Sequence, residues 1–167
     1  MTRCRCFMCR AERLAPLLVL ALLAWAIPAP GQWASTGTSV KPRLLSSVAV
    51  SPVTASSTVF LALDGGDVSA TQGAVAHPFD RVVLRRLRCG VSVAPGTGET
   101  ITLTVQTGAC GTALADSSVA CTISGTATTG ADLADTVTVA DGECAVLKAI
   151  YSAGAAASLP RAQLAAF

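Results

Sequence analysis

The chain of 167 residues contains no asparagine, one histidine and one tyrosine, and its two tryptophans lie within the first 33 residues. Without asparagine it has no site for N-linked glycosylation. One histidine supplies a single imidazole for acid–base chemistry or for metal binding beside cysteine. Sandwich-type carbohydrate modules stack sugar rings on exposed tryptophan or tyrosine, so the scarcity of both beyond Ser35 weakens that interpretation.

Charge is also scarce, at 13% of residues against 51% hydrophobic residues, which excludes a disordered tail and a coiled coil. The formal charge of +2 arises from 12 basic and 10 acidic residues. Four arginines and one glutamate precede residue 14, and the remainder holds eight basic against nine acidic residues. We therefore expect no nucleic-acid partner.

Residues 1–34 have the pattern of a secretory signal peptide. A basic start, MTRCRCFMCRAER, leads into the apolar run Leu14–Ile27, which Pro28 and Pro30 close. A membrane-spanning helix needs about 20 apolar residues, so this run is too short. We expect cleavage between Gln32 and Ser35 and a secreted, periplasmic or cell-surface bacterial product with no stable membrane span. An uncleaved signal anchor is the alternative.

Short alternating segments dominate the rest of the chain. Residues 35–57 are rich in Ser, Thr, Val and Pro without a clear period, which predicts an extended arm or a loosely attached first strand. Beyond them, Ile101, Leu103 and Val105 alternate with polar residues, as in a half-buried strand. Similar segments occur at residues 59–63, 87–93, 119–123, 137–139, 144–151 and 163–167.

Roughly seven or eight short strands, separated by Gly, Pro, Asp and Ser turns, predict an all-β fold for residues 58–167. An antiparallel β-sandwich is the first choice, and an up-and-down barrel is the second. The alanine-rich residues 153–159 include a glycine and precede Pro160, so they allow at most one helical turn.

Two runs carry a resemblance to a known family: APGTGETITLTVQTG (Ala94–Gly108) and VACTISGTATTGADLADTVTVADGECAVLKA (Val119–Ala149). They resemble small jelly-roll sandwiches of bacterial and phage proteins, over roughly Asp80–Phe167. The sequence departs from that pattern at Gly108–Ser118, which has an extra cysteine and a longer loop. The resemblance implies a jelly-roll fold without catalytic residues. Because such domains resemble fibre-tip and complement-head-like heads, it also implies self-association as a homotrimer.

Four cysteines follow the leader: Cys89, Cys110, Cys121 and Cys144. An even number in an exported chain predicts a disulfide framework, with three possible pairings. We favour Cys110 with Cys121, which flank a loop between consecutive strands, and hence Cys89 with Cys144. The alternative is that Cys89 and Cys121 are buried free thiols.

Metal and cofactor binding are not expected. The four cysteines contain no Cys-x-x-Cys pair, and Cys4, Cys6 and Cys9 lie in the leader. The carboxylate pairs lack the dense spacing of a calcium loop and are better explained as turn residues. These pairs are Asp64 with Asp67, Asp132 with Asp135, and Asp141 with Glu143.

Four arginines form the one local concentration of charge: Arg81, Arg85, Arg86 and Arg88. Guanidinium groups bind carboxylates and phosphates in a bidentate manner, so this stripe suits an acidic glycan or a partner protein. It equally suits an edge strand protected from pairing with another sheet, or a solvated face.

No motif assembles an active site. Residues 90–94 loosely resemble a nucleophile elbow, but Ser92 is predicted to face outward from a strand that runs into a Pro-Gly turn. His77 precedes Pro78, which favours a surface or strand-capping role. The sequence thus favours an exported, non-enzymatic structural or adhesive sandwich. The second hypothesis is a module that binds an acidic glycan or protein through the arginine stripe, and a secreted hydrolase is the third.

Overall fold

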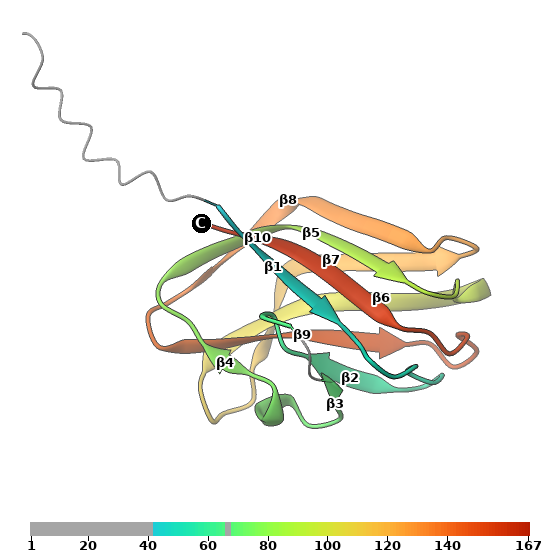
Figure 1. Ribbon diagram of the computed structural model, residues 1–167, viewed down its shortest axis with the longest axis horizontal. Helices are drawn as coiled ribbons and strands as arrows, with labels where there is room; N and C mark the ends of the chain where they lie inside the picture. The colour runs from blue at the N-terminus through green and yellow to red at the C-terminus, as the bar shows by residue number, and fades with distance from the viewer. Residues whose placement is uncertain (1–41, 66–67) are drawn as a thin grey trace, which may run out of the picture. The chain divides into compact units, whose positions relative to one another are not determined.

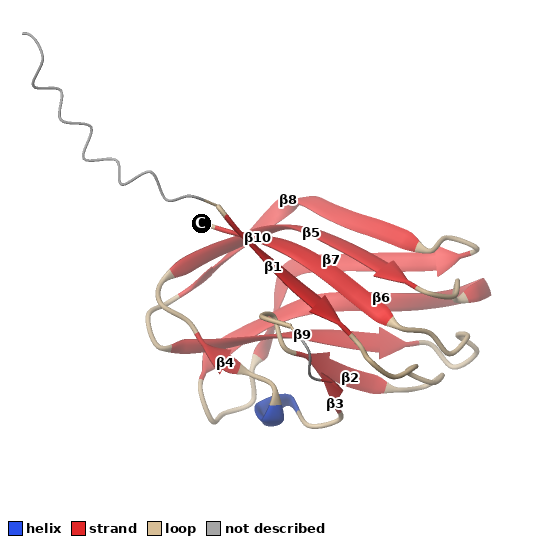
Figure 2. Ribbon diagram, in the orientation of Figure 1, coloured by secondary structure: helices blue, strands red, loops and turns tan. Residues whose placement is uncertain are grey.

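The computed structural model describes residues 42–65 and 68–167, and the expected leader lies outside this range. The described chain consists of β-strands and one short 3₁₀ turn at Gln72–Ala74, without an α-helix (Figure 2). Two antiparallel sheets pack face to face as a β-sandwich (Figure 1), and the predicted all-β sandwich is confirmed.

Each sheet has a simple strand order. The first sheet runs β1 (Arg43–Val48), β10 (Pro160–Ala166), β5 (Val82–Val91) and β8 (Thr129–Val139). The second runs β3 (Val68–Ser69), β2 (Thr58–Leu61), β9 (Glu143–Tyr151), β6 (Gly96–Ala109) and β7 (Ala115–Gly125), and β4 (His77–Pro78) also pairs with β9.

Without the two-residue strands β3 and β4, the order is that of a jelly roll. Counted along the chain, the long strands stand 1-8-3-6 in the first sheet and 2-7-4-5 in the second. The first strand therefore pairs with the last, and the second with the one before the last, as in a folded double Greek key. Both chain ends of the sandwich consequently lie in one sheet (Figure 1).

Aliphatic side chains fill the space between the sheets. Ile101, Leu103 and Val105 of β6 are fully buried, as their alternation predicts, and so are Val119, Cys121 and Ile123 of β7. Each such side chain contributes about 1.5 to 3 kcal/mol when it leaves water. Among the described residues, Tyr151 is the one buried aromatic residue of this core.

The sandwich begins earlier than residue 58. Arg43–Val48 pairs with β10 along its whole length, from Arg43 opposite Ala166 to Val48 opposite Arg161. Its inward positions are occupied by Leu45 and Ser47, both buried. Because the inward position of Ser47 is polar, the alternation of apolar residues is interrupted. The sequence therefore does not show that β1 is a regular strand of the sheet.

The two disulfide bonds pair differently from the favoured expectation: Cys89 bonds with Cys121, and Cys110 bonds with Cys144. The hairpin argument for Cys110 with Cys121 is wrong because of strand register. In the β6–β7 hairpin, Cys121 lies opposite Leu103, far along the strand from the loop that holds Cys110. Cys144 on β9 lies opposite Gly108, close to Cys110.

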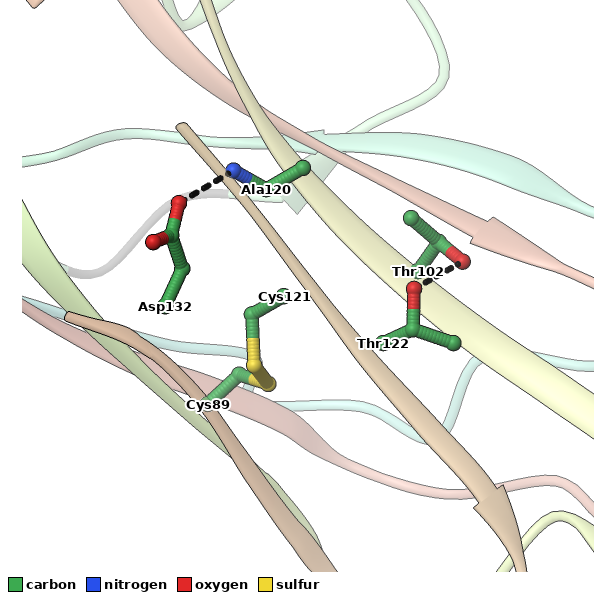
Figure 3. The surroundings of a disulfide bond; sticks show 6 residues. All are labelled: Cys89, Thr102, Ala120, Cys121, Thr122 and Asp132. Carbon is green, nitrogen blue, oxygen red and sulfur yellow. Dashed lines mark hydrogen bonds between the residues drawn. A yellow bond between two sulfur atoms is a disulfide. The ribbon is translucent and has the colours of Figure 1, made fainter. Parts of the chain in front are cut away.

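The Cys89–Cys121 bond joins the two sheets through the core (Figure 3), with both cysteines buried and a Cα–Cα distance of 6.3 Å. The alternative of two free thiols is therefore also wrong. Two disulfide bonds indicate an oxidising compartment outside the cytoplasm. In the described part of the chain, no helix has the length and hydropathy to cross a membrane.

Candidate ligand-binding face

Most of the predicted arginine stripe lies on a central strand. Arg85, Arg86 and Arg88 belong to β5, which pairs with β10 on one side and with β8 on the other. Protection of an edge strand is therefore not their role. The next question is which of these side chains lie on the outer face of the first sheet, the face that points away from the core.

Strand register places three rows of side chains on this outer face. The row through Arg85 contains Leu44, Ala165 and Thr136; the row through Arg88 contains Ser46, Gln163 and Ala131; the third contains Val48, Arg161, Gly90 and Thr129. None of the three rows includes an aspartate or a glutamate. We call the surface formed by Arg85, Arg88 and Arg161 the basic face.

Arg161 joins this face from β10, and sequence reasoning missed it. It lies far from β5 along the chain, and its only link to the stripe is the pairing of Arg161 with Gly90. A Cβ atom built on Gly90 would lie 2.7 Å from Nε of Arg161, so the arginine side chain lies across the bare backbone of β5. Arg161 and Arg88 are diagonal neighbours, whose Cα atoms are typically about 7 to 8 Å apart.

A shallow hollow of about 310 Å³ lies at this point of the basic face. Arg88 and Arg161 line it together with the polar side chains of Ser46, Thr129 and Gln163. Two guanidinium groups with hydroxyl and amide donors form a site suited to carboxylate or sulfate groups, because charge-assisted bidentate hydrogen bonds are the strongest such contacts.

The other predicted arginines have different surroundings. The guanidinium of Arg85 lies 3.8 Å from the ring centroid of Phe167, a cation–π contact that half-buries it. Arg86 stands at a break in the register with a backbone φ of +58°, as in a bulge. Arg81 precedes β5 and lines a separate hollow at one end of the sandwich.

On the second sheet, by contrast, the basic residue Lys148 is paired with a carboxylate. On its outer face, Nζ of Lys148 bonds to Oδ2 of Asp116, and Nε2 of Gln106 donates to Oδ1 of the same carboxylate at 2.7 Å. The hydrogen bond from Lys148 is the main cause that lowers the pKa of Asp116 below its ordinary value of 3.8. The ion pairs in the described chain are Lys148–Asp116 and His77–Asp64, so no described arginine is paired with a carboxylate within 4.0 Å.

The residues considered for catalysis are separated or structurally engaged. Nε2 of His77 lies 3.7 Å from Oδ1 of Asp64, and both side chains are about half exposed. Among the described residues, no hydrogen bond joins His77 to a hydroxyl or a thiol. Oγ of Ser92 accepts a hydrogen bond from the backbone N–H of Leu159 at 2.9 Å and so secures a loop.

Two of the carboxylates predicted as turn residues, Asp132 and Glu143, accept hydrogen bonds from backbone N–H groups. Oδ2 of Asp132 accepts from Ala120 (Figure 3), while its Oδ1 accepts from Ala134 and Asp135. Oε2 of Glu143 accepts from Ala140. Asp67 lies outside the described residues. Within the described ranges, no three His, Cys, Asp or Glu residues are grouped closely enough to hold a metal ion.

Comparison of the chain with protein-family models, curated proteins and solved structures found no match. The site must therefore be interpreted from its own chemistry, which is that of an exposed basic face on a disulfide-bonded jelly roll.

Proposed function

We propose that this protein is an exported, non-enzymatic adhesive module that binds an acidic glycan through the basic face of its first sheet. The proposal rests mainly on the positions of Arg88 and Arg161. They come from different strands, are diagonal neighbours on the sheet, and lie in rows that contain no acidic residue. The leader pattern and the two disulfide bonds support export to an oxidising surface or extracellular location.

The shape of the face favours an extended ligand. The hollow is shallow, and the exposed residues Ser46, Gln163 and Thr129 continue it across four strands. A linear polymer with repeated carboxylate groups can contact several rows at once, whereas isolated surface guanidinium groups bind a single small anion weakly. The absence of acidic residues from the rows removes competition for the guanidinium groups.

A binding assay on immobilised polygalacturonate, with neutral dextran as the reference polymer, tests the proposal. The oxidised domain should bind polygalacturonate but not dextran, and binding should weaken as salt screens the charges. The double variant R88Q/R161Q should bind at least tenfold more weakly. R43Q/R81Q is the matched control, because it removes the same two charges at positions outside the basic face.

Equal loss of binding in R43Q/R81Q and R88Q/R161Q would show that net charge alone drives the interaction, and would overturn the proposed site. Binding to dextran as strong as to polygalacturonate would overturn the acidic-glycan assignment. Arg88 and Arg161 are both exposed, so their substitution leaves the core packing intact and the variants should remain folded.

A further inference from the structure

The two disulfide bonds differ in their access to solvent. Cys110 is exposed in the turn that follows β6, and its partner Cys144 on β9 is 4% exposed. Both of these cysteines line a hollow of about 470 Å³, a volume in the range of small-molecule sites. Cys89 borders the hollow of the basic face, but its side chain points into the core, toward the buried Cys121. One bond is therefore open to a small molecule and the other is enclosed.

The accessible bond joins two segments that backbone pairing already holds together. β6 and β9 are paired as far as Ala109 opposite Glu143, and Cys110 is the next residue along the chain. The turn after β6 is also fixed at its far end, where the backbone N–H of Leu114 donates to Oε1 of Gln72 at 3.0 Å. Opening of this bond removes a covalent constraint but breaks no backbone pair, so we expect the domain to remain folded when it opens.

The surroundings of this bond permit the approach of a thiolate. Disulfide bonds exchange through attack of a thiolate on one sulfur atom, and access to that sulfur governs the rate. The described side chains that line the hollow beside the two cysteines are uncharged and include Gln72, Thr112 and Leu114, so they do not repel an anion. Oε2 of the nearby Glu143 accepts a hydrogen bond from the backbone N–H of Ala140 at 2.9 Å. A buried bond, in contrast, becomes accessible only when the structure opens.

We propose that Cys110–Cys144 is a site of reversible thiol–disulfide exchange with a low-molecular-weight thiol of the glutathione class. The thiolate attacks Sγ of Cys110 and forms a mixed disulfide, and the expelled Cys144 thiolate takes a proton from solvent. A second thiolate then attacks the sulfur of the bound thiol, which releases a small-molecule disulfide and the Cys110 thiolate, protonated in turn. The domain gains two electrons while two thiols are oxidised to one disulfide, and the reverse sequence restores the bond. This exchange does not depend on glycan binding, because Arg88 and Arg161 line a different hollow.

Incubation of the oxidised, folded domain with reduced glutathione, followed by acid quenching and alkylation, tests the proposal. Digestion at acidic residues and mass spectrometry then report each cysteine on a separate peptide. Glutathione should be found on Cys110, and alkylation should appear at Cys110 and Cys144. The Cys89–Cys121 bond should open at least tenfold more slowly. The circular dichroism spectrum of the β-sheets should stay unchanged throughout the reaction.

The same reaction in concentrated urea is the control, because the fold then protects neither bond and both should open at similar rates. The folded variant C110A/C144A should incorporate no glutathione. Equal opening rates of the two bonds in the folded domain, or glutathione on a cysteine other than Cys110, would overturn the proposal. So would unfolding that accompanies the opening of Cys110–Cys144, or a lack of exchange at thiol concentrations that open both bonds in urea.

Discussion

Gly90 lets the side chain of Arg161 lie directly against the backbone of β5, in the row next to that of Arg88. Its position in the row is outward, where any other residue would place a side chain in the space that the Arg161 side chain occupies. Because Gly90 has none, the aliphatic stem of Arg161 covers the β5 backbone and brings its guanidinium over the neighbouring strand. The absence of a side chain at Gly90 thus allows the position that Arg161 takes beside Arg88.

Substitution of Gly90 by alanine should weaken polygalacturonate binding several-fold while the domain remains folded. The new Cβ would displace Arg161, which is flexible, and its contact with the backbone oxygen of Thr128 at 3.5 Å is ordinary. Gly73→Ala is the control, since nothing lies within 4 Å of its Cβ position. Unchanged affinity in G90A would contradict the role given to Gly90.

Asp116 makes the stability of the domain depend on pH. Its pKa is lowered in the folded state, chiefly by the hydrogen bond from Lys148, so its contribution is present above the ordinary pKa of 3.8. The contribution is lost as pH falls through the lower folded pKa. The carboxylate is about half exposed, and an exposed ion pair of this kind contributes about 0.2 to 1 kcal/mol.

Asp116→Asn should therefore lower the free energy of unfolding at neutral pH, and the difference from the unmodified protein should shrink as pH falls below about 3.8. Urea denaturation at neutral and acidic pH measures both quantities. Asp141→Asn, a substitution at an exposed turn, serves as the control. A difference that grows with acidity would contradict this account of Asp116.

At the scale of strands, the two disulfide bonds join different parts of the sandwich. Cys89–Cys121 ties one sheet to the other, and Cys110–Cys144 ties the turn that follows β6 to the neighbouring strand β9. Their sequence separations of 32 and 34 are nearly equal, so chain entropy predicts a similar contribution of about 4 kcal/mol from each. Burial distinguishes them, because Cys110 is exposed whereas Cys89 and Cys121 lie in the core.

The pair of substitutions C89A/C121A should destabilise the domain more than C110A/C144A. Both remove one covalent loop, but the first also leaves a cavity between the sheets. Urea unfolding of the two variants gives the comparison. Equal losses, or a larger loss in C110A/C144A, would show that the inter-sheet bond is not the more important one.

Cleavage at acidic residues tests the pairing itself. Glu99, Asp116 and Glu143 separate the four cysteines, so complete digestion under non-reducing conditions leaves each cysteine on a different peptide. Mass spectrometry should find Cys89 joined to Cys121. A peptide that joins Cys110 to Cys121 would contradict the structure.

Strands with regular alternation were predictable from the sequence, and strand partners were not. The inward faces of β6 and β7 follow from alternation around Leu103 and Cys121, whose burial the structure confirms. Arg161 and the cysteine pairing depend on which strands lie side by side. In a jelly roll most neighbours are distant in sequence, so local patterns carry little information about them.

At the scale of the whole molecule, the two sheets present unlike outer faces. The second sheet neutralises Lys148 with Asp116, whereas the rows of the first sheet that hold Arg88 and Arg161 contain no acidic residue. Under the proposed function, such a division would orient the molecule in front of a polyanion, because a surface with charges of one sign steers association.

Self-association remains a prediction that rests on the resemblance to trimeric head domains. Size-exclusion chromatography with light scattering on the oxidised domain measures it directly. A trimer would multiply the number of basic faces per particle and raise avidity for a polymer. A monomer at high concentration would contradict the prediction and leave the domain as an independent module.

The most direct test of the central claim is an amide NMR titration of the oxidised domain with oligogalacturonate. We expect chemical-shift changes centred on Arg88, Gly90, Arg161 and Gln163, on the outer face of the first sheet. Changes centred on the outer face of the second sheet around Lys148, or no changes at all, would contradict it.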